Sequence, residues 1–153
     1  MRHETLVDES TGRKFTLDEP DDIGPRTMLV LSLHGGGSVG HWQHAYFPIH
    51  EHADSKRVIV ITPSAATKEP FRRWDGDADD AHLRAVVDQV VERVGAANLS
   101  SFWLAGHSQG SMTARRLLGT EWFAGRVDGW LSLSGGRIGA VEMVPDFGPP
   151  WRE

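Results

Sequence analysis

The segment Gly106-His107-Ser108-Gln109-Gly110 sets one serine between two glycines. The apolar run 101–105 precedes it and predicts a strand, and residues 111–118 follow it with a helix-compatible pattern. So sharp a strand-to-helix turn needs glycine on both flanks, because a β-carbon there would collide with neighbouring backbone. The hydroxyl would stand beside the first amides of a helix, which favour developing negative charge. We therefore expect Ser108 to be a nucleophile, although a tight turn with a solvent-facing hydroxyl would show the same short motif.

A second glycine-rich segment, His34-Gly35-Gly36-Gly37, follows the apolar run 29–33. Because glycine has no side chain, nothing shields its backbone N–H groups, and a substrate oxygen can approach them closely. Aligned N–H donors at a developing oxyanion lower the barrier of acyl transfer by about 3–4 kcal/mol. We expect Gly36 to be the first donor and Gly37 the second. Gln109 would add its amide because it directly follows the serine.

The histidines near these segments are weaker candidates for a catalytic base or for metal ligands. His107 adjoins the serine, but adjacent side chains on a tight turn point apart, so we do not expect it to be the base. Residues 34–52 hold five histidines, among which His41 and His44 would share a helix face. No carboxylate or cysteine follows them at a familiar zinc spacing. The glycines also fit a dinucleotide fingerprint, but the next strand ends without the required acidic residue. We therefore predict neither a metal nor a cofactor.

The surrounding elements must place these two segments together. Residues 2–9 and 12–19 predict a hairpin, 28–33 and 57–62 predict buried strands, and 101–105 and 129–134 predict two further strands. Residues 79–94 carry apolar side chains on one helical face, and 109–118 predict a second helix. Alternating buried strands and amphipathic helices predict an α/β fold, with a doubly wound, mostly parallel sheet flanked by helices in one domain over residues 1–153.

These motifs, in this order, resemble the α/β-hydrolase superfamily of serine esterases and lipases over about residues 2–136. The pair Trp74-Asp75, the pair Asp79-Asp80 at the start of a long helix, and the Ser-Gln-Gly turn look most similar to the feruloyl esterase and polyhydroxybutyrate depolymerase-like branch. The resemblance implies hydrolysis of a small-molecule or polymer-borne ester. Amide or thioester chemistry would use the same turn. We expect both acidic pairs to fix a loop and cap the helix.

The C-terminal segment departs from this resemblance. The family carries its catalytic acid and histidine late in the chain, but residues 135–153 contain no histidine. Asp146 is a candidate for the acid, and a surface turn residue is the alternative for it. We expect a C-terminally truncated hydrolase core whose isolated chain is nearly inactive, because losing the base costs about 10⁴–10⁶ in rate. A non-enzymatic binding or assembly module is the alternative.

Composition excludes several other classes of function. The net charge of -5, with no basic block, argues against a nucleic-acid partner. No apolar run approaches the roughly 18 residues of a membrane span, and residues 1–22 are too polar for a signal peptide, which slightly favours the cytoplasm. Stopping after the strand 129–134 would leave it as an apolar sheet edge, and we expect self-association there.

Overall fold

The computed structural model describes residues 1–134, and six strands in that range form one sheet. The strands are β1 (Arg2–Val7), β2 (Lys14–Glu19), β3 (Thr27–Leu33), β4 (Val58–Pro63), β5 (Leu99–His107) and β6 (Gly129–Leu133). Their order across the sheet is β1-β2-β4-β3-β5-β6. β1 and β2 form an antiparallel hairpin and β2 runs antiparallel to β4, whereas the remaining pairs are parallel. The carboxyl ends of β3, β4, β5 and β6 therefore lie at one edge of the sheet.

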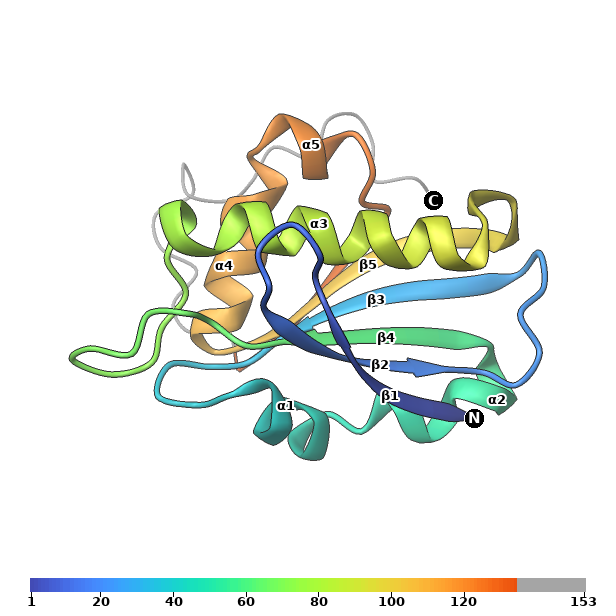
Figure 1. Ribbon diagram of the computed structural model, residues 1–153, viewed down its shortest axis with the longest axis horizontal. Coiled ribbons are helices and arrows are strands. Elements are labelled where there is room, and N and C mark those ends of the chain that lie inside the picture. Colours follow the sequence, from blue (N-terminus) through green and yellow to red (C-terminus); the bar gives the residue numbers. More distant parts are fainter. Residues whose placement is uncertain (135–153) are drawn as a thin grey trace.

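Helices cover both faces of the sheet (Figure 1). On one face lie α3 (Gly76–Val94), α4 (Gln109–Leu118) and α5 (Glu121–Ala124). On the other lie α1 (Gly40–Tyr46) and α2 (Ala53–Lys56), joined by the 3-10 turn η1 (Ile49–His52). A second 3-10 turn, η2 (Ala96–Asn98), follows α3. This is the doubly wound α/β arrangement that the sequence predicted.

The core is divided by the sheet because successive strand residues point to opposite faces. Leu29 and Leu31 of β3 pack in the larger cluster, which also contains the buried face of α3. Val30, between them, packs in a smaller cluster with Val58, Val60 and Ala105, and Phe47 and Ile49 complete that cluster. Both faces of β3 are thus buried, as its nearly continuous apolar run predicted.

The boundaries of the predicted elements shift by a few residues. The long helix begins at Gly76 rather than Asp79, because Asp75 is its N-cap and the Asp75 side chain accepts a hydrogen bond from the Asp77 N–H. β5 extends from Leu99 to His107 and so reaches the serine directly. The hairpin, the two buried strands before residue 64 and the helix 109–118 are confirmed.

β6 is the last strand in the order of the sheet, and Leu131 on it is exposed. Pairing of this strand with another chain stays a prediction. No helix among the described residues is long and apolar enough to cross a membrane. Asp146, the candidate acid, lies outside the described residues.

Candidate active site

Ser108 occupies the turn between β5 and α4 in a strained backbone conformation. Its φ is 52° and its ψ is -115°, a combination that costs a non-glycine residue about 1–3 kcal/mol. A β-carbon on Gly106 would lie 2.4 Å from the backbone of Gly110, and one on Gly110 would lie 2.2 Å from the Leu33 carbonyl oxygen. Neither position can accept a side chain. The two flanking glycines are therefore required by packing, as the motif predicted.

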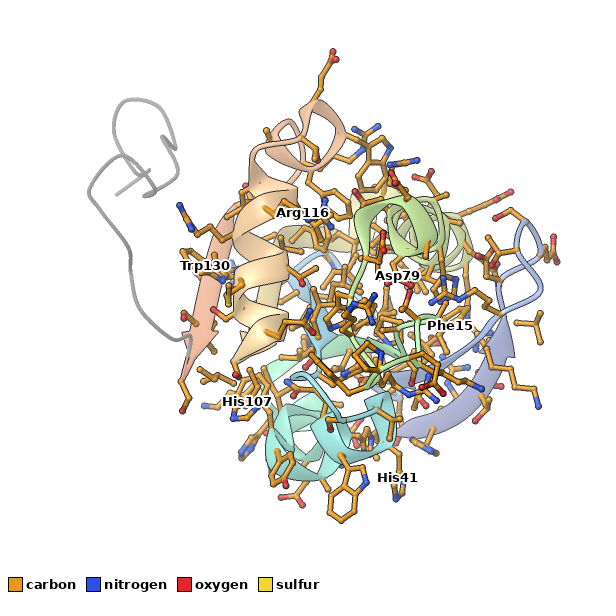
Figure 2. All side chains as sticks on the ribbon, turned by 90° about the vertical axis from the view of Figure 1, so that its left-hand side faces the viewer. Phe15, His41, Asp79, His107, Arg116 and Trp130 are labelled. Carbon is orange, nitrogen blue, oxygen red and sulfur yellow. The ribbon has the colours of Figure 1, made fainter. Side chains whose placement is uncertain are left out.

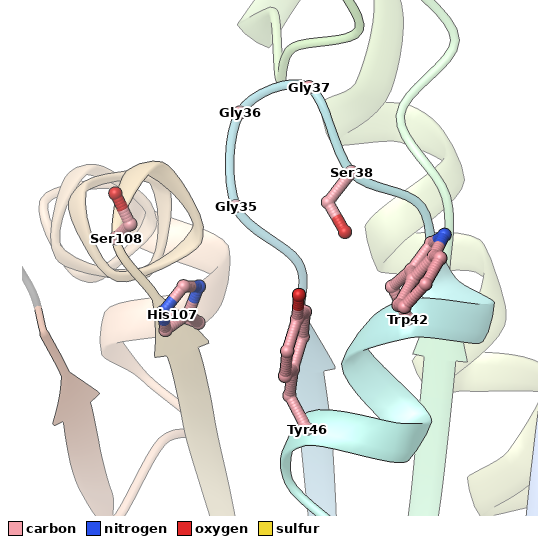
Figure 3. A pocket seen from close by; sticks show the side chains of 8 residues that line it. All are labelled: Gly35, Gly36, Gly37, Ser38, Trp42, Tyr46, His107 and Ser108. Carbon is pink, nitrogen blue, oxygen red and sulfur yellow. The ribbon is translucent and has the colours of Figure 1, made fainter.

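The glycine loop after β3 lies across a pocket from this turn (Figure 3). The pocket has a volume of about 310 Å³ and is lined by Gly35, Gly36, Gly37, Ser38, Trp42, Tyr46, His107 and Ser108. A β-carbon on Gly35 would lie 3.5 Å from the β-carbon of Ser108, so the two segments approach closely. They meet because β3 and β5 are parallel neighbours, with Leu33 opposite Gly106.

The backbone donors around the pocket differ in what they already bind. Among residues 1–134, the N–H groups of Gly36 and Gln109 have no hydrogen-bond acceptor. The Gly37 N–H, in contrast, donates to the Arg72 carbonyl oxygen at 2.7 Å. The Gly37 N–H therefore already has an acceptor, and its role as a second oxyanion donor stays a prediction. Its φ of 74° instead lets the loop turn back toward Arg72.

Trp74 connects the glycine loop to the serine turn. Its indole Nε1–H donates to the His34 carbonyl oxygen at 2.8 Å, and its ring lies 4.6 Å from the His34 ring. Its backbone N–H donates to Gln109 Oε1 at 3.2 Å, and Gln109 Nε2 contacts its carbonyl oxygen at 3.4 Å. One residue thus fixes both segments that carry the candidate oxyanion donors. This explains physically why a tryptophan here accompanies the Ser-Gln-Gly turn.

His34 is buried and holds the glycine loop in place. Its Nδ1–H donates to the Gly35 carbonyl oxygen at 2.8 Å, and its Nε2 accepts from the Ala65 N–H at 3.0 Å. Burial lowers the pKa of His34, while the hydrogen bond to Gly35 opposes that shift. Both ring nitrogens are engaged with backbone, so this neutral imidazole orders the loop and is not placed to accept a proton from substrate.

Asp79 lies in the first turn of α3, and its buried side chain fixes the loop that carries Trp74 (Figure 2). Its carboxylate accepts from the N–H groups of Ala66 at 3.0 Å and Asp75 at 2.8 Å, and from Arg13 Nη2 at 2.8 Å. The cap of α3 is Asp75, so within the predicted acidic pairs the capping and loop-fixing roles fall on different residues. Asp80 instead forms a two-point ion pair with Arg116 of α4.

Comparison with solved structures decides the type of fold. The acetyl xylan esterase from Aspergillus awamori matches this structure with a TM-score of 0.71 and 16% sequence identity, over 89% of this chain and 54% of that one. The chain has the α/β-hydrolase fold.

Other matches with this fold are also esterases. Esterase Est22 matches with a TM-score of 0.58 and 19% identity, over 84% of this chain and 42% of that one. In sequence, the bifunctional acetylxylan esterase/xylanase XynS20E of Neocallimastix patriciarum is 26% identical over 107 residues, which are 69% of this chain and 16% of that protein. No protein-family model matches the sequence. The chain thus spans about half the length of these solved structures and about a sixth of the curated relative.

Among residues 1–134, no side chain forms a hydrogen bond with the Ser108 hydroxyl. His107 lines the pocket, but its ring stacks on Tyr46 of α1 with centroids 5.9 Å apart (Figure 3). His107 therefore contributes to the pocket wall, and the expectation that it is not the base stays a prediction.

Proposed function

We propose that this chain carries the nucleophile and oxyanion site of a serine hydrolase that acts on carboxylic esters. The observation that carries the proposal is the conformation of Ser108. Ser108 has a φ of 52°, which is strained for a non-glycine residue, and the glycines on either side of it leave no room for a side chain. The fold thus maintains backbone strain at the residue that carries the hydroxyl. Strain of this kind persists where the surrounding structure enforces it, and such places are commonly reactive sites.

The proposed reaction is acyl transfer through a covalent intermediate. Ser108 Oγ attacks the ester carbonyl carbon, and the carbonyl oxygen becomes an oxyanion. The N–H groups of Gly36 and Gln109 would donate to that oxygen, because Gly36 lines the pocket, Gln109 directly follows Ser108, and neither N–H has another acceptor among residues 1–134. Such donors contribute about 3–4 kcal/mol. The alcohol then leaves, and water hydrolyses the acyl-serine.

The proton acceptor completes this mechanism. A base takes the Ser108 proton and passes it to the leaving alcohol. The described residues place no base at the hydroxyl, so the proposal assigns this role to a group outside residues 1–134. Asp146, which lies there, remains a candidate for the acid that would orient such a base.

The substrate would be a small or polymer-borne ester. The pocket volume of about 310 Å³ is at the small end of ligand sites, which span about 300–1,000 Å³. A short acyl group therefore fits the pocket better than a long chain. The names of the matched proteins, which are esterases and acetyl xylan esterases, agree with this substrate class.

Hydrolysis of p-nitrophenyl acetate by the full-length natural protein, including any residues beyond 153, tests the proposal. We expect Ser108→Ala to reduce turnover by about 10⁴–10⁶, the loss typical of a missing nucleophile. Ser38→Ala is the matched control, because Ser38 lines the same pocket, and we expect less than a tenfold change. Binding of the ester without turnover in the unmodified protein would favour the alternative, a catalytically incomplete hydrolase-like binding or assembly module.

A further inference from the structure

Two histidines and one aspartate meet between the N-terminal hairpin and α1, outside the pocket. His3 of β1 and Asp18 of β2 lie opposite each other in the antiparallel register, and His44 reaches them from α1. Asp18 Oδ1 lies 2.6 Å from His3 Nδ1, and Asp18 Oδ2 lies 2.9 Å from His44 Nε2. One ring nitrogen from each histidine and a carboxylate oxygen lie within 4.8 Å of one another. Three segments far apart in sequence thus present three metal-ligating groups to one point.

The carboxylate at the centre of this cluster is fully buried. The side chain of Asp18 is 0% exposed, and within residues 1–134 its polar side-chain contacts are the two imidazoles. The nearby arginines, Arg2 and Arg93, bind Glu19 instead. A buried carboxylate is costly unless a cation accompanies it. Among the described residues no arginine or lysine pairs with Asp18, so this site favours an added cation.

We propose that His3, Asp18 and His44 bind a divalent first-row transition-metal ion, with Zn²⁺ as the reference ion. Imidazole nitrogen suits Zn²⁺ and its neighbours in the series, whereas Mg²⁺ and Ca²⁺ prefer oxygen ligands throughout. Bonds of about 2.0–2.2 Å in tetrahedral geometry set ligand atoms about 3.3 Å apart. The two observed contacts of 2.6 and 2.9 Å are shorter than that value and the limit of 4.8 Å exceeds it, so separations would have to change by up to about 1.5 Å for the three groups to close on the ion. His3 is half exposed on its strand and can make such an adjustment.

A third histidine supports the geometry of the site. The ring of His50 stacks on that of His44, with centroids 3.5 Å apart and planes inclined by 17°. This contact holds the His44 ring in its orientation toward Asp18. The Nδ1 of His50 is buried and has no hydrogen-bond partner among the described residues. Among the described residues, at least one imidazole nitrogen beside the cluster therefore forms no hydrogen bond.

The ion would have a structural role, because it would join the hairpin to α1. The same helix carries Trp42 and Tyr46, which line the pocket. An ion bound at His44 would therefore fix one wall of the pocket from the opposite side of the helix. This site is independent of the proposed serine chemistry, and its test does not depend on turnover.

Calorimetric titration of the chelator-treated full chain with ZnCl₂ tests the site. We expect one Zn²⁺ per chain, a rise in melting temperature on binding, and no response to MgCl₂. His3→Gln and His44→Gln should each weaken Zn²⁺ binding by at least about 10-fold, the loss that even outer partners of a metal site cause. His41→Gln is the matched control, because His41 is exposed on the outer side of the same helix (Figure 2).

Two results would overturn the proposal. One is the absence of stoichiometric Zn²⁺ binding to the unmodified chain. The other is binding that His3→Gln and His44→Gln leave unchanged, which would place the ion on other surface histidines. Imidazole resonances in nuclear magnetic resonance spectra provide a second readout on the unmodified chain, so the test does not depend on the variants folding. Zn²⁺ should shift those of His3 and His44 and leave those of His41 in place.

Discussion

Replacing Asp79 with alanine should destabilise the chain strongly, because this buried carboxylate is the shared acceptor of the loop before α3. The change leaves the N–H groups of Ala66 and Asp75 without their acceptor and Arg13 without its ion pair. Each orphaned buried donor costs about 1–3 kcal/mol. Breaking a buried ion pair by removing one partner costs about 3–5 kcal/mol. Both costs arise from the same contacts of the Asp79 carboxylate and are not added together. We therefore expect a total loss of about 3–5 kcal/mol in the free energy of unfolding.

Urea unfolding followed by tryptophan fluorescence measures this loss. Asp77→Ala is the matched control, because Asp77 is exposed on the same turn of α3, and we expect it to change the free energy of unfolding by less than about 1 kcal/mol. Hydrogen exchange should also accelerate at the amides of Ala66 and Asp75. A loss below about 1 kcal/mol for Asp79→Ala, or one equal to that of the control, would refute the reasoning that this carboxylate holds the loop.

Three further changes test other contacts. Gly36→Val should reduce turnover by about 100-fold or more while the melting temperature changes little, since the side chain would crowd the oxyanion position; unchanged turnover per folded molecule would make the loop purely structural. Gly110→Ala should cost at least about 3 kcal/mol in urea unfolding, because its β-carbon would lie 2.2 Å from the Leu33 carbonyl oxygen, whereas Gly125→Ala meets its nearest atom at 3.5 Å and should be tolerated. Burial lowers the pKa of His82 from its ordinary 6.5 in the folded chain. As the pH drops below about 6.5, the unfolded chain therefore binds a proton at His82 more readily than the folded chain does, and the free energy of unfolding should fall. A urea midpoint that stays level from pH 7 to 5.5, or that falls equally in His82→Gln, would contradict this assignment.

Much of the fold could be predicted from local patterns. The strands at 28–33 and 57–62 are nearly continuous apolar runs, and such runs are typical of strands buried on both faces. The apolar face of α3 repeats at helical spacing, which predicted the helix but not its start. That start depends on a single hydrogen bond, from the Asp77 N–H to the Asp75 side chain.

The site was predictable only where its residues are neighbours in sequence. Ser108 and its two glycines form one local motif, and packing explains all three. The hydrogen bond of the Gly37 amide could not be predicted, because its acceptor, the carbonyl oxygen of Arg72, lies 35 residues later in the chain.

The histidine–aspartate cluster was missed for a similar reason. His3 and Asp18 meet through the register of the hairpin, and His44 meets them through the position of α1. Neither contact can be predicted from the spacing of these residues along the chain. A search for metal ligands within residues 34–52 therefore could not include Asp18, and the carboxylate inside that range, Glu51, does not belong to the cluster.

Reaction of the full-length natural protein, including any residues beyond 153, with a fluorophosphonate probe, with the labelled residue located by mass spectrometry, tests the central proposal most directly. The probe reports on an activated serine and does not require the natural ester. We predict one adduct per chain, on the peptide that contains Ser108, and its loss in Ser108→Ala. Equal labelling of Ser108→Ala, or an adduct on another serine of the pocket such as Ser38, would contradict the assignment of the nucleophile.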